Sequence, residues 1–270
     1  MEREEVTIND IAKEAGVSKA TVSRVLNNPE KVAKKTREKI LRVIQEKNYR
    51  PNPIARSLTT RRTGVIGVVV SDITNPFYAV MVRSIEEVCR SYQYHIFLCN
   101  TDGREEEEEL YVKSLIEKKV DGIILGATLM NDQEIQSLAQ TQTPMIFVSR
   151  LPENREQYDY VIVDSVLGGY LATKYLLSLG HTKIAYLGGH WPTSSNLERL
   201  EGYKRALEEA GIEARNEYIY CGEFRMENGY REGIKILRAG KYRPTAVFSA
   251  NDAMAIGLLE ACNEEGIKVP

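Results

Sequence analysis

From residue 64 onward, short β-rich runs alternate with longer helical stretches, and this alternation restricts the fold more than any other feature of the sequence. The expected strands cover residues 65–70, 95–100, 122–125, 145–148, 160–163, 183–187 and 246–249. The expected helices cover residues 77–91, 105–118, 166–179, 197–210, 227–237 and 252–265. Strands that alternate with helices form parallel sheets covered on both faces, so the sequence predicts an α/β body.

The first 62 residues differ from this body in charge. They hold 15 Lys and Arg against 8 Asp and Glu, whereas the remainder holds 21 against 30. The chain is therefore basic in front and acidic behind, although its net charge is only -2. An acidic body is repelled by phosphates, so this division favours a polyanionic partner for the front end alone.

The front end carries the signals of a helix-turn-helix. Thr7 and Asp10 have the spacing of a capping pair, and the apolar residues that follow recur at helical spacing. Gly16 can adopt the positive φ of a tight turn, Val17 can fill the angle between two helices, and Ser18 can cap the second. A third helix is expected over residues 34–47. The sequence therefore predicts an all-α module with a three-helix core.

The second helix has one face that suits the major groove of DNA. Val22, Val25 and Leu26 are expected to point inward, and the outward face carries donors and small groups. Its members are Lys19, Ala20, Ser23, Arg24 and Asn27. Lys and Arg can donate to guanine, Ala can contact a thymine methyl group, and hydroxyl and amide groups can hold phosphates. An ordinary amphipathic hairpin with a solvated face is the alternative reading.

A linker separates this module from the body. Pro51 and Pro53 prevent the third helix from continuing, and residues 54–59 could form only a helix too short to be stable alone. Such a segment can fold on contact with DNA, or it can be a plain tether. We therefore expect a DNA-binding domain over residues 1–50, a hinge helix or linker over 51–62, and a core over 63–270.

The front end resembles the LacI/GalR family of transcription regulators. The resemblance is carried by VTINDIAKEAGVSKATVSRVLN at residues 6–27, TREKI at 36–40 and NYRPNPIARSL at 48–58. It implies base reading by Lys19, Ala20 and Arg24, with phosphate contacts from Ser18, Thr21, Ser23 and Asn27. It also implies a hinge helix in the minor groove, where Leu58 would be the apolar wedge. Asn52 and Ala55 complete the expected DNA-binding residues.

The body resembles the core of the same family, which looks like a periplasmic sugar-binding protein with its effector in a cleft between two lobes. The matching segments are NPFY at 75–78, VDGII at 120–124, GHTKIA at 180–185, RLEGYKRAL at 199–207 and NDAMA at 251–255. Loops after parallel strands are the usual place for ligands. The resemblance implies apolar platforms at Phe77 and Phe224, a guanidinium grip at Arg199 and an amide at Asn251. Asp72 and Arg150 are further expected contacts, whereas Asp164 can instead cap a helix.

Other classes of function find little support. The four cysteines are scattered and are expected to be small buried hydrophobic residues, and no metal-binding, cofactor-binding or catalytic motif is present. We therefore expect no cofactor, no metal and no enzyme activity. The first residues lack the apolar stretch of a signal peptide, and no membrane span is evident, so a cytoplasmic location is expected. A transport binding protein and an α/β enzyme with a DNA module remain as alternative classes.

The resemblance implies a ligand-responsive repressor that binds a near-palindromic operator as a homodimer. A carbohydrate-utilisation operon is the expected target, and a sugar is favoured over a purine as effector. Members of the resembled family continue beyond the position of Pro270. We therefore expect a C-terminally shortened relative with an incomplete second lobe.

Overall fold

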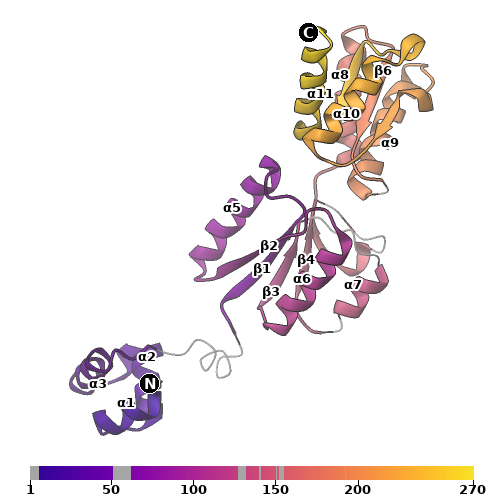
Figure 1. The fold of residues 1–270 in the computed structure, drawn as a ribbon. Helices are drawn as coiled ribbons and strands as arrows, with labels where there is room; N and C mark the ends of the chain where they lie inside the picture. The colour runs from indigo at the N-terminus through magenta and orange to yellow at the C-terminus, as the bar shows by residue number, and fades with distance from the viewer. Residues whose placement is uncertain are drawn as a thin grey trace. The chain divides into compact units, whose positions relative to one another are not determined.

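A computed structural model describes residues 6–50, 62–126, 132–139, 141–149, 151, 155–191 and 193–270. The chain divides into two compact units, Met1–Thr63 and Gly64–Pro270 (Figure 1). Four of the predicted site residues lie outside the described residues: Asn52, Ala55, Leu58 and Arg150.

The first unit is a bundle of short helices. They are α1 (Ile8–Ala15), α2 (Lys19–Asn27), the 3-10 turn η1 (Pro29–Lys31) and α3 (Lys34–Glu46). The predicted capping box is present, because the Thr7 amide donates to Asp10 Oδ2 at 2.9 Å and the Asp10 amide donates to Thr7 Oγ1 at 3.4 Å. Gly16 has a φ of 64° and ends α1 in the left-handed conformation that glycine adopts freely.

One small apolar core holds these helices together. Ile11, Ala15, Val22, Val25 and Ile40 are buried in it, each from the inward face of its helix. Val17 packs against the same core from the turn between α1 and α2. The helix-turn-helix fold predicted from sequence is therefore present.

The second unit contains two parallel sheets. The first has the strand order β2-β1-β3-β4-β5, and all its neighbouring strands are parallel. Its strands are β1 (Val65–Val70), β2 (His95–Asn100), β3 (Gly122–Leu125), β4 (Met145–Val148) and β5 (Asp159–Val161). Its helices are α5 (Pro76–Ser91), α6 (Glu105–Glu117) and α7 (Asp132–Ala139), with the turn η2 (Arg155–Gln157) before β5. We call this part lobe 1.

Alternation along β1 shows that lobe 1 is covered on both faces. Val68 and Val70 pack in one cluster with Tyr78 of α5. Val69 packs in another with Val112 and Leu115 of α6. A strand whose successive side chains are all buried must lie between two layers of helices, as a parallel sheet requires.

The second sheet has the order β7-β6-β8, again with parallel neighbours. Its strands are β6 (Ile184–Gly188), β7 (Ile219–Cys221) and β8 (Ala246–Ser249). Its helices are α8 (Ser165–Ser178), α9 (Ser194–Glu209), α10 (Met226–Leu237) and α11 (Asp252–Glu264), with the short turns η3 (Asn216–Tyr218) and η4 (Gly240–Tyr242). Leu176 of α8 and Tyr203 of α9 pack with Tyr186, whereas Ile236 of α10 and Met254 of α11 pack with Leu187. We call this part lobe 2.

Glycines allow the helices of lobe 2 to pack in close pairs. A Cβ on Gly169 of α8 would lie 2.2 Å from the Arg199 carbonyl oxygen, and one on Gly202 of α9 would lie 2.0 Å from that of Val166. The pair α10 and α11 has the same arrangement. A Cβ on Gly229 would lie 2.2 Å from the Met254 carbonyl oxygen, and one on Gly257 would lie 2.0 Å from that of Met226. Backbone contact of this kind excludes any side chain at these positions.

Besides the 3-10 turns, the structure adds a helix and a strand that the sequence patterns did not indicate, α7 and β7. β7 has only three residues, too few for a period-2 pattern, and becomes a strand by pairing with β6. The cysteines also differ from expectation, because Cys262 is buried whereas Cys89, Cys99 and Cys221 are only partly so. Within the described ranges, no helix is long and apolar enough to cross a membrane.

The glycine contacts predict opposite effects at two adjacent positions in α8. Gly169→Ala should lower the free energy of unfolding by about 1–3 kcal/mol, because the added methyl group forces α8 away from α9. Gly168→Ala is the matched control, since its methyl group meets nothing within 4 Å, and it should raise stability by up to about 1 kcal/mol. Urea unfolding curves measure both. Equal effects of the two substitutions would contradict the close packing of α8 and α9.

Candidate nucleic-acid interface and ligand cleft

Helix α2 presents the outward face that the sequence predicted. Lys19, Ala20 and Arg24 are exposed, whereas Val22 and Val25 are buried in the three-helix core. The helix that carries these exposed side chains is anchored in the core by the residues on its opposite face. This geometry allows α2 to enter a groove of DNA without unfolding its own module.

The smaller polar residues of this face also stabilise the helix. Ser18 Oγ accepts a hydrogen bond from the Thr21 amide at 3.2 Å and lies 2.9 Å from Thr21 Oγ1. Asn27 Nδ2 donates to the Ser23 carbonyl oxygen at 3.0 Å. Ser18 and Asn27 are exposed, and Thr21 and Ser23 are half-buried. The four residues that were predicted to contact phosphates therefore also stabilise α2 through hydrogen bonds among themselves.

Two electrostatic contacts support the start and end of the module. The hydrogen bond from Thr7 holds the pKa of Asp10 below its usual value. Lys47, just after α3, lies 2.9 Å from Glu14 of α1, and this hydrogen bond and charge raise the pKa of Lys47. Both contacts are at the surface, so they orient helices rather than supply much stability.

The second unit contains a cleft with two neighbouring cavities that share lining residues and are lined from both lobes. The larger, of about 530 Å³, is lined by Ser71, Asp72, Asn75, Tyr78, Asp102, Gly103, Arg104, His190, Glu223, Phe224 and Arg225. The smaller, of about 270 Å³, is lined by residues that include Phe77, Ser149, Arg199, Phe224 and Asn251. The structure thus brings together the five described residues that were predicted to bind effector.

The lobe 1 wall is a loop braced by its own side chains. Asp72 Oδ1 accepts from the Thr74 amide at 2.9 Å, and Asn75 Oδ1 caps α5 by accepting from the Phe77 amide at 3.0 Å. Asn100, at the end of β2, accepts from the Ile73 amide at 2.8 Å. The Phe77 ring remains 54% exposed and is available to a ligand.

The lobe 2 wall depends on the buried amide of Asn196. Its Oδ1 accepts from Tyr186 Oη at 2.8 Å and from the Gly189 amide at 2.9 Å. The Phe224 ring lies directly against Gly189, because a Cβ there would approach ring atoms to 2.2 Å. Asn196 therefore fixes the loop on which the aromatic platform rests.

Asn251 has a positioning role in this wall. Its Oδ1 caps α11 by accepting from the Met254 amide at 2.9 Å, and its Nδ2 donates to the Phe224 carbonyl oxygen at 3.2 Å. Arg199 is half-buried, and its Nη1 donates to the Ser195 carbonyl oxygen at 3.3 Å. Asp164 accepts from the Leu167 amide at 2.8 Å and so caps α8, which is the alternative role that the sequence analysis gave it.

Burial raises the pKa of two ionisable groups near the lobe 2 wall, Tyr186 and Cys221. Burial raises the pKa of the Tyr186 hydroxyl well above its usual value. Burial likewise raises the pKa of the Cys221 thiol, which keeps it protonated and a poor nucleophile. Within the part of the chain that the structure describes, no group of three or more metal-ligating side chains occurs.

The sequence analysis missed four charged residues of the larger cavity: Asp102, Arg104, Glu223 and Arg225. Asp102 follows the correctly predicted strand β2, so the strand-end rule could have found it. Glu223 and Arg225 follow β7, which the sequence pattern did not reveal.

Comparisons with known proteins agree with this architecture. Residues 7–52 match a family model described as bacterial regulatory proteins of the lacI family. Residues 63–270 match a model described as periplasmic binding proteins and sugar binding domain of the LacI family. Among curated relatives, the HTH-type transcriptional regulator DegA of Bacillus subtilis (strain 168) is 39% identical over 98% of this chain and 78% of its own. The HTH-type transcriptional repressor PurR of Vibrio vulnificus (strain CMCP6) is 40% identical over 98% and 79%.

Solved structures extend the likeness to the three-dimensional fold. The Lac repressor dimer bound to operator and the anti-inducer ONPF has a TM-score of 0.83 and 28% identity, over 98% of this chain and 80% of that one. The transcriptional regulator CelR in complex with cellobiose has a TM-score of 0.69 and 31% identity over the same shares. These similar proteins are transcriptional regulators rather than enzymes. This chain therefore belongs to the LacI family of bacterial regulatory proteins, in which a DNA-binding helix-turn-helix precedes a periplasmic-binding-like α/β core.

Proposed function

We propose that this chain is a cytoplasmic, ligand-responsive repressor that binds a near-palindromic operator as a homodimer and controls a carbohydrate-utilisation operon. The observation that carries the proposal is the presence of two separate binding surfaces on one chain. One is the exposed basic face of α2, and the other is the cleft lined by Phe77, Arg199 and Phe224. A ligand that changes the geometry of the lobes alters DNA affinity through a coupling free energy between the two sites.

Base reading is assigned to Lys19, Ala20 and Arg24 because they are exposed on α2. Ser18, Thr21, Ser23 and Asn27 are assigned to phosphates, since hydroxyl and amide groups that order the helix can also donate outward. In the linker, Asn52, Ala55 and Leu58 are assigned to the minor groove by resemblance alone.

Dimerisation is supported by exposed apolar side chains on lobe 1. Val80 and Val88 of α5 are exposed, as are Tyr92 just after this helix and Phe97 and Leu98 of β2. β2 lies at one edge of the lobe 1 sheet. Large apolar side chains exposed on a helix and on an edge strand favour a protein–protein interface. A second copy of the chain is the proposed occupant.

A sugar is the proposed effector because the cleft combines aromatic faces with hydrogen-bonding groups. Phe77 and Phe224 offer apolar surfaces to a pyranose ring, while Arg199, Asp72 and a positioned Asn251 surround them with polar groups. Arg150 is a further proposed contact. The cellobiose complex of CelR supports the same class. A purine is the second candidate, favoured by the repressors named PurR among the relatives.

Removing the Arg24 guanidinium should impair sequence discrimination. Arg24→Ala is expected to weaken binding to a selected operator by about 1–3 kcal/mol and to relax preference at one base pair of each half-site. Lys13→Ala removes an exposed charge from α1 and is the control, for which the base preference should stay unchanged. Fluorescence anisotropy with single-base operator variants at fixed salt measures this effect. Unchanged discrimination in Arg24→Ala would remove this residue from base reading.

Ligand binding can be followed by the emission of Trp191, the chain's single tryptophan. It adjoins His190, which lines the larger cavity. Arg199→Lys should weaken binding of the sugar found by screening about tenfold or more, because an ammonium group cannot reproduce the two-pronged donation of a guanidinium. Arg205→Lys, on the same helix but paired with Glu209 at the surface, should bind normally. Equal affinities of the two variants would exclude Arg199 from the ligand site.

The proposed dimer surface predicts different results at two equally exposed positions. Val88→Lys on α5 should shift the chain toward monomer, because it places a charge in the apolar interface. Leu110→Lys on α6 is the control; Leu110 is 59% exposed and Val88 60% exposed. Sedimentation velocity over a range of concentrations measures the equilibrium. A monomeric parent chain, or equal effects of both substitutions, would contradict this interface.

A further inference from the structure

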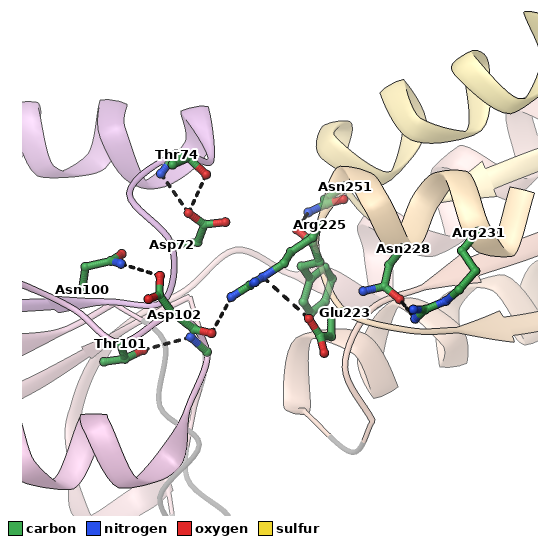
Figure 2. Close-up of polar contacts among 12 residues, drawn as sticks. Asp72, Thr74, Asn100, Thr101, Asp102, Glu223, Arg225, Asn228, Arg231 and Asn251 are labelled. Carbon is green, nitrogen blue, oxygen red and sulfur yellow. Dashed lines mark hydrogen bonds and ion pairs between the residues drawn. The ribbon is translucent and has the colours of Figure 1, made fainter.

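A hydrogen bond crosses the mouth of the cleft between the two lobes. Arg225 Nη2, on the loop that leads into α10 of lobe 2, donates to the carbonyl oxygen of Asp102 in lobe 1 at 2.5 Å (Figure 2). Both residues line the 530 Å³ cavity, and neither was assigned to effector or DNA binding above. The contact therefore lies where movement of one lobe against the other would open or close the cavity.

The acceptor is held rigidly by a tight turn after β2. Asp102 and Gly103 both have positive φ, 53° and 70°, and the Arg104 amide donates to the Thr101 carbonyl oxygen at 3.1 Å. These are the features of a type I′ turn. The Gly103 amide donates to the Ser71 carbonyl oxygen at 3.1 Å, and Asn100 Nδ2 donates to Asp102 Oδ1 at 2.7 Å. The turn thus presents the Asp102 carbonyl in a fixed direction.

The donor is positioned equally well in lobe 2. Arg225 is the N-cap residue of α10, where its carbonyl oxygen accepts from the Gly229 amide at 3.1 Å and its amide donates to the Glu223 carbonyl oxygen at 2.8 Å. The Glu223 carboxylate lies 3.6 Å from Arg225 Nε, on the side of the guanidinium away from Asp102 (Figure 2). A charged donor strengthens the hydrogen bond to the carbonyl, and the neighbouring carboxylate helps to orient the guanidinium.

We propose that the bond between Arg225 and Asp102 is a latch that holds the lobes together across the cleft in the ligand-free chain. The latch biases the population of lobe arrangements before any effector binds. A ligand with acceptor oxygens in the larger cavity can take the place of the Asp102 carbonyl oxygen as the acceptor for the Arg225 guanidinium. Binding of a ligand in the cavity and the arrangement of the lobes are then linked through Arg225. Arg225 then acts as a positioning residue. This inference goes beyond the proposed function, because it concerns the chain without DNA or effector.

Hydrogen–deuterium exchange on the full ligand-free chain tests the latch, comparing the parent with Arg225→Gln. The variant should exchange about three to ten times faster in peptides that cover residues 100–104 of lobe 1, which it does not alter chemically. Arg231→Gln is the control; it removes an arginine of α10 whose partners, Asn228 and Glu232, lie within the same helix. The control should leave exchange over residues 100–104 unchanged.

Two results would overturn the proposal. One is parental exchange over residues 100–104 in Arg225→Gln. The other is faster exchange confined to the first turn of α10, which would assign Arg225 a local role at the helix start. Since the experiment uses neither operator nor effector, either result would leave the proposed repressor function intact.

Discussion

Parallel strands bring their carboxyl ends to one edge of a sheet, and the binding chemistry of this chain depends on that constraint. In lobe 1, the ends of β1 and β2 are followed by Asp72 and Asp102. In lobe 2, the ends of β7 and β8 are followed by Phe224 and Asn251. Residues far apart in sequence consequently line shared cavities. The loops carry the side chains that line these cavities, while the buried strands keep the loops in place.

Rigidity of the lobe 2 wall comes from close backbone packing and one buried amide. The glycines at positions 169 and 202 let α8 and α9 touch, which gives α9 a fixed position beside the sheet. Asn196, near the start of α9, then ties the end of β6 to that helix and leaves room for the Phe224 ring against Gly189. The position of the Phe224 ring therefore depends on contacts that form within the protein and that a ligand does not need to create. Preorganisation of this kind reduces the entropy that the protein loses when a ligand binds.

Much of this architecture could be predicted from local patterns, and the exceptions have physical causes. Gly16, Ser18 and the capping pair Thr7 and Asp10 act over three or four residues, so the sequence alone indicated the helix-turn-helix. β7 was missed because a three-residue strand acquires its identity from its neighbour β6 rather than from its own periodicity.

The candidate site was less predictable than the fold for a related reason. The resemblance named Phe224, but the dependence of its position on Asn196 involves residues that only tertiary packing brings together. Arg225 is a similar case, since its partner Asp102 is 123 residues earlier in the chain. The sequence also suggested that Asn251 contacts ligand, and the structure adds that its amide caps α11 and holds the Phe224 backbone. Roles assigned to single residues therefore depend on partners that local patterns do not specify.

The most direct test of the account is whether ligand and DNA binding are coupled in one chain. The measurement is the affinity of the full chain for a duplex selected from a pool of near-palindromic sequences, with sugars and purines added in turn at constant salt. We expect sequence-selective binding whose affinity one of these ligands changes at least fivefold. Binding without sequence preference, or selective binding that a ligand occupying the cleft leaves unaltered, would contradict it.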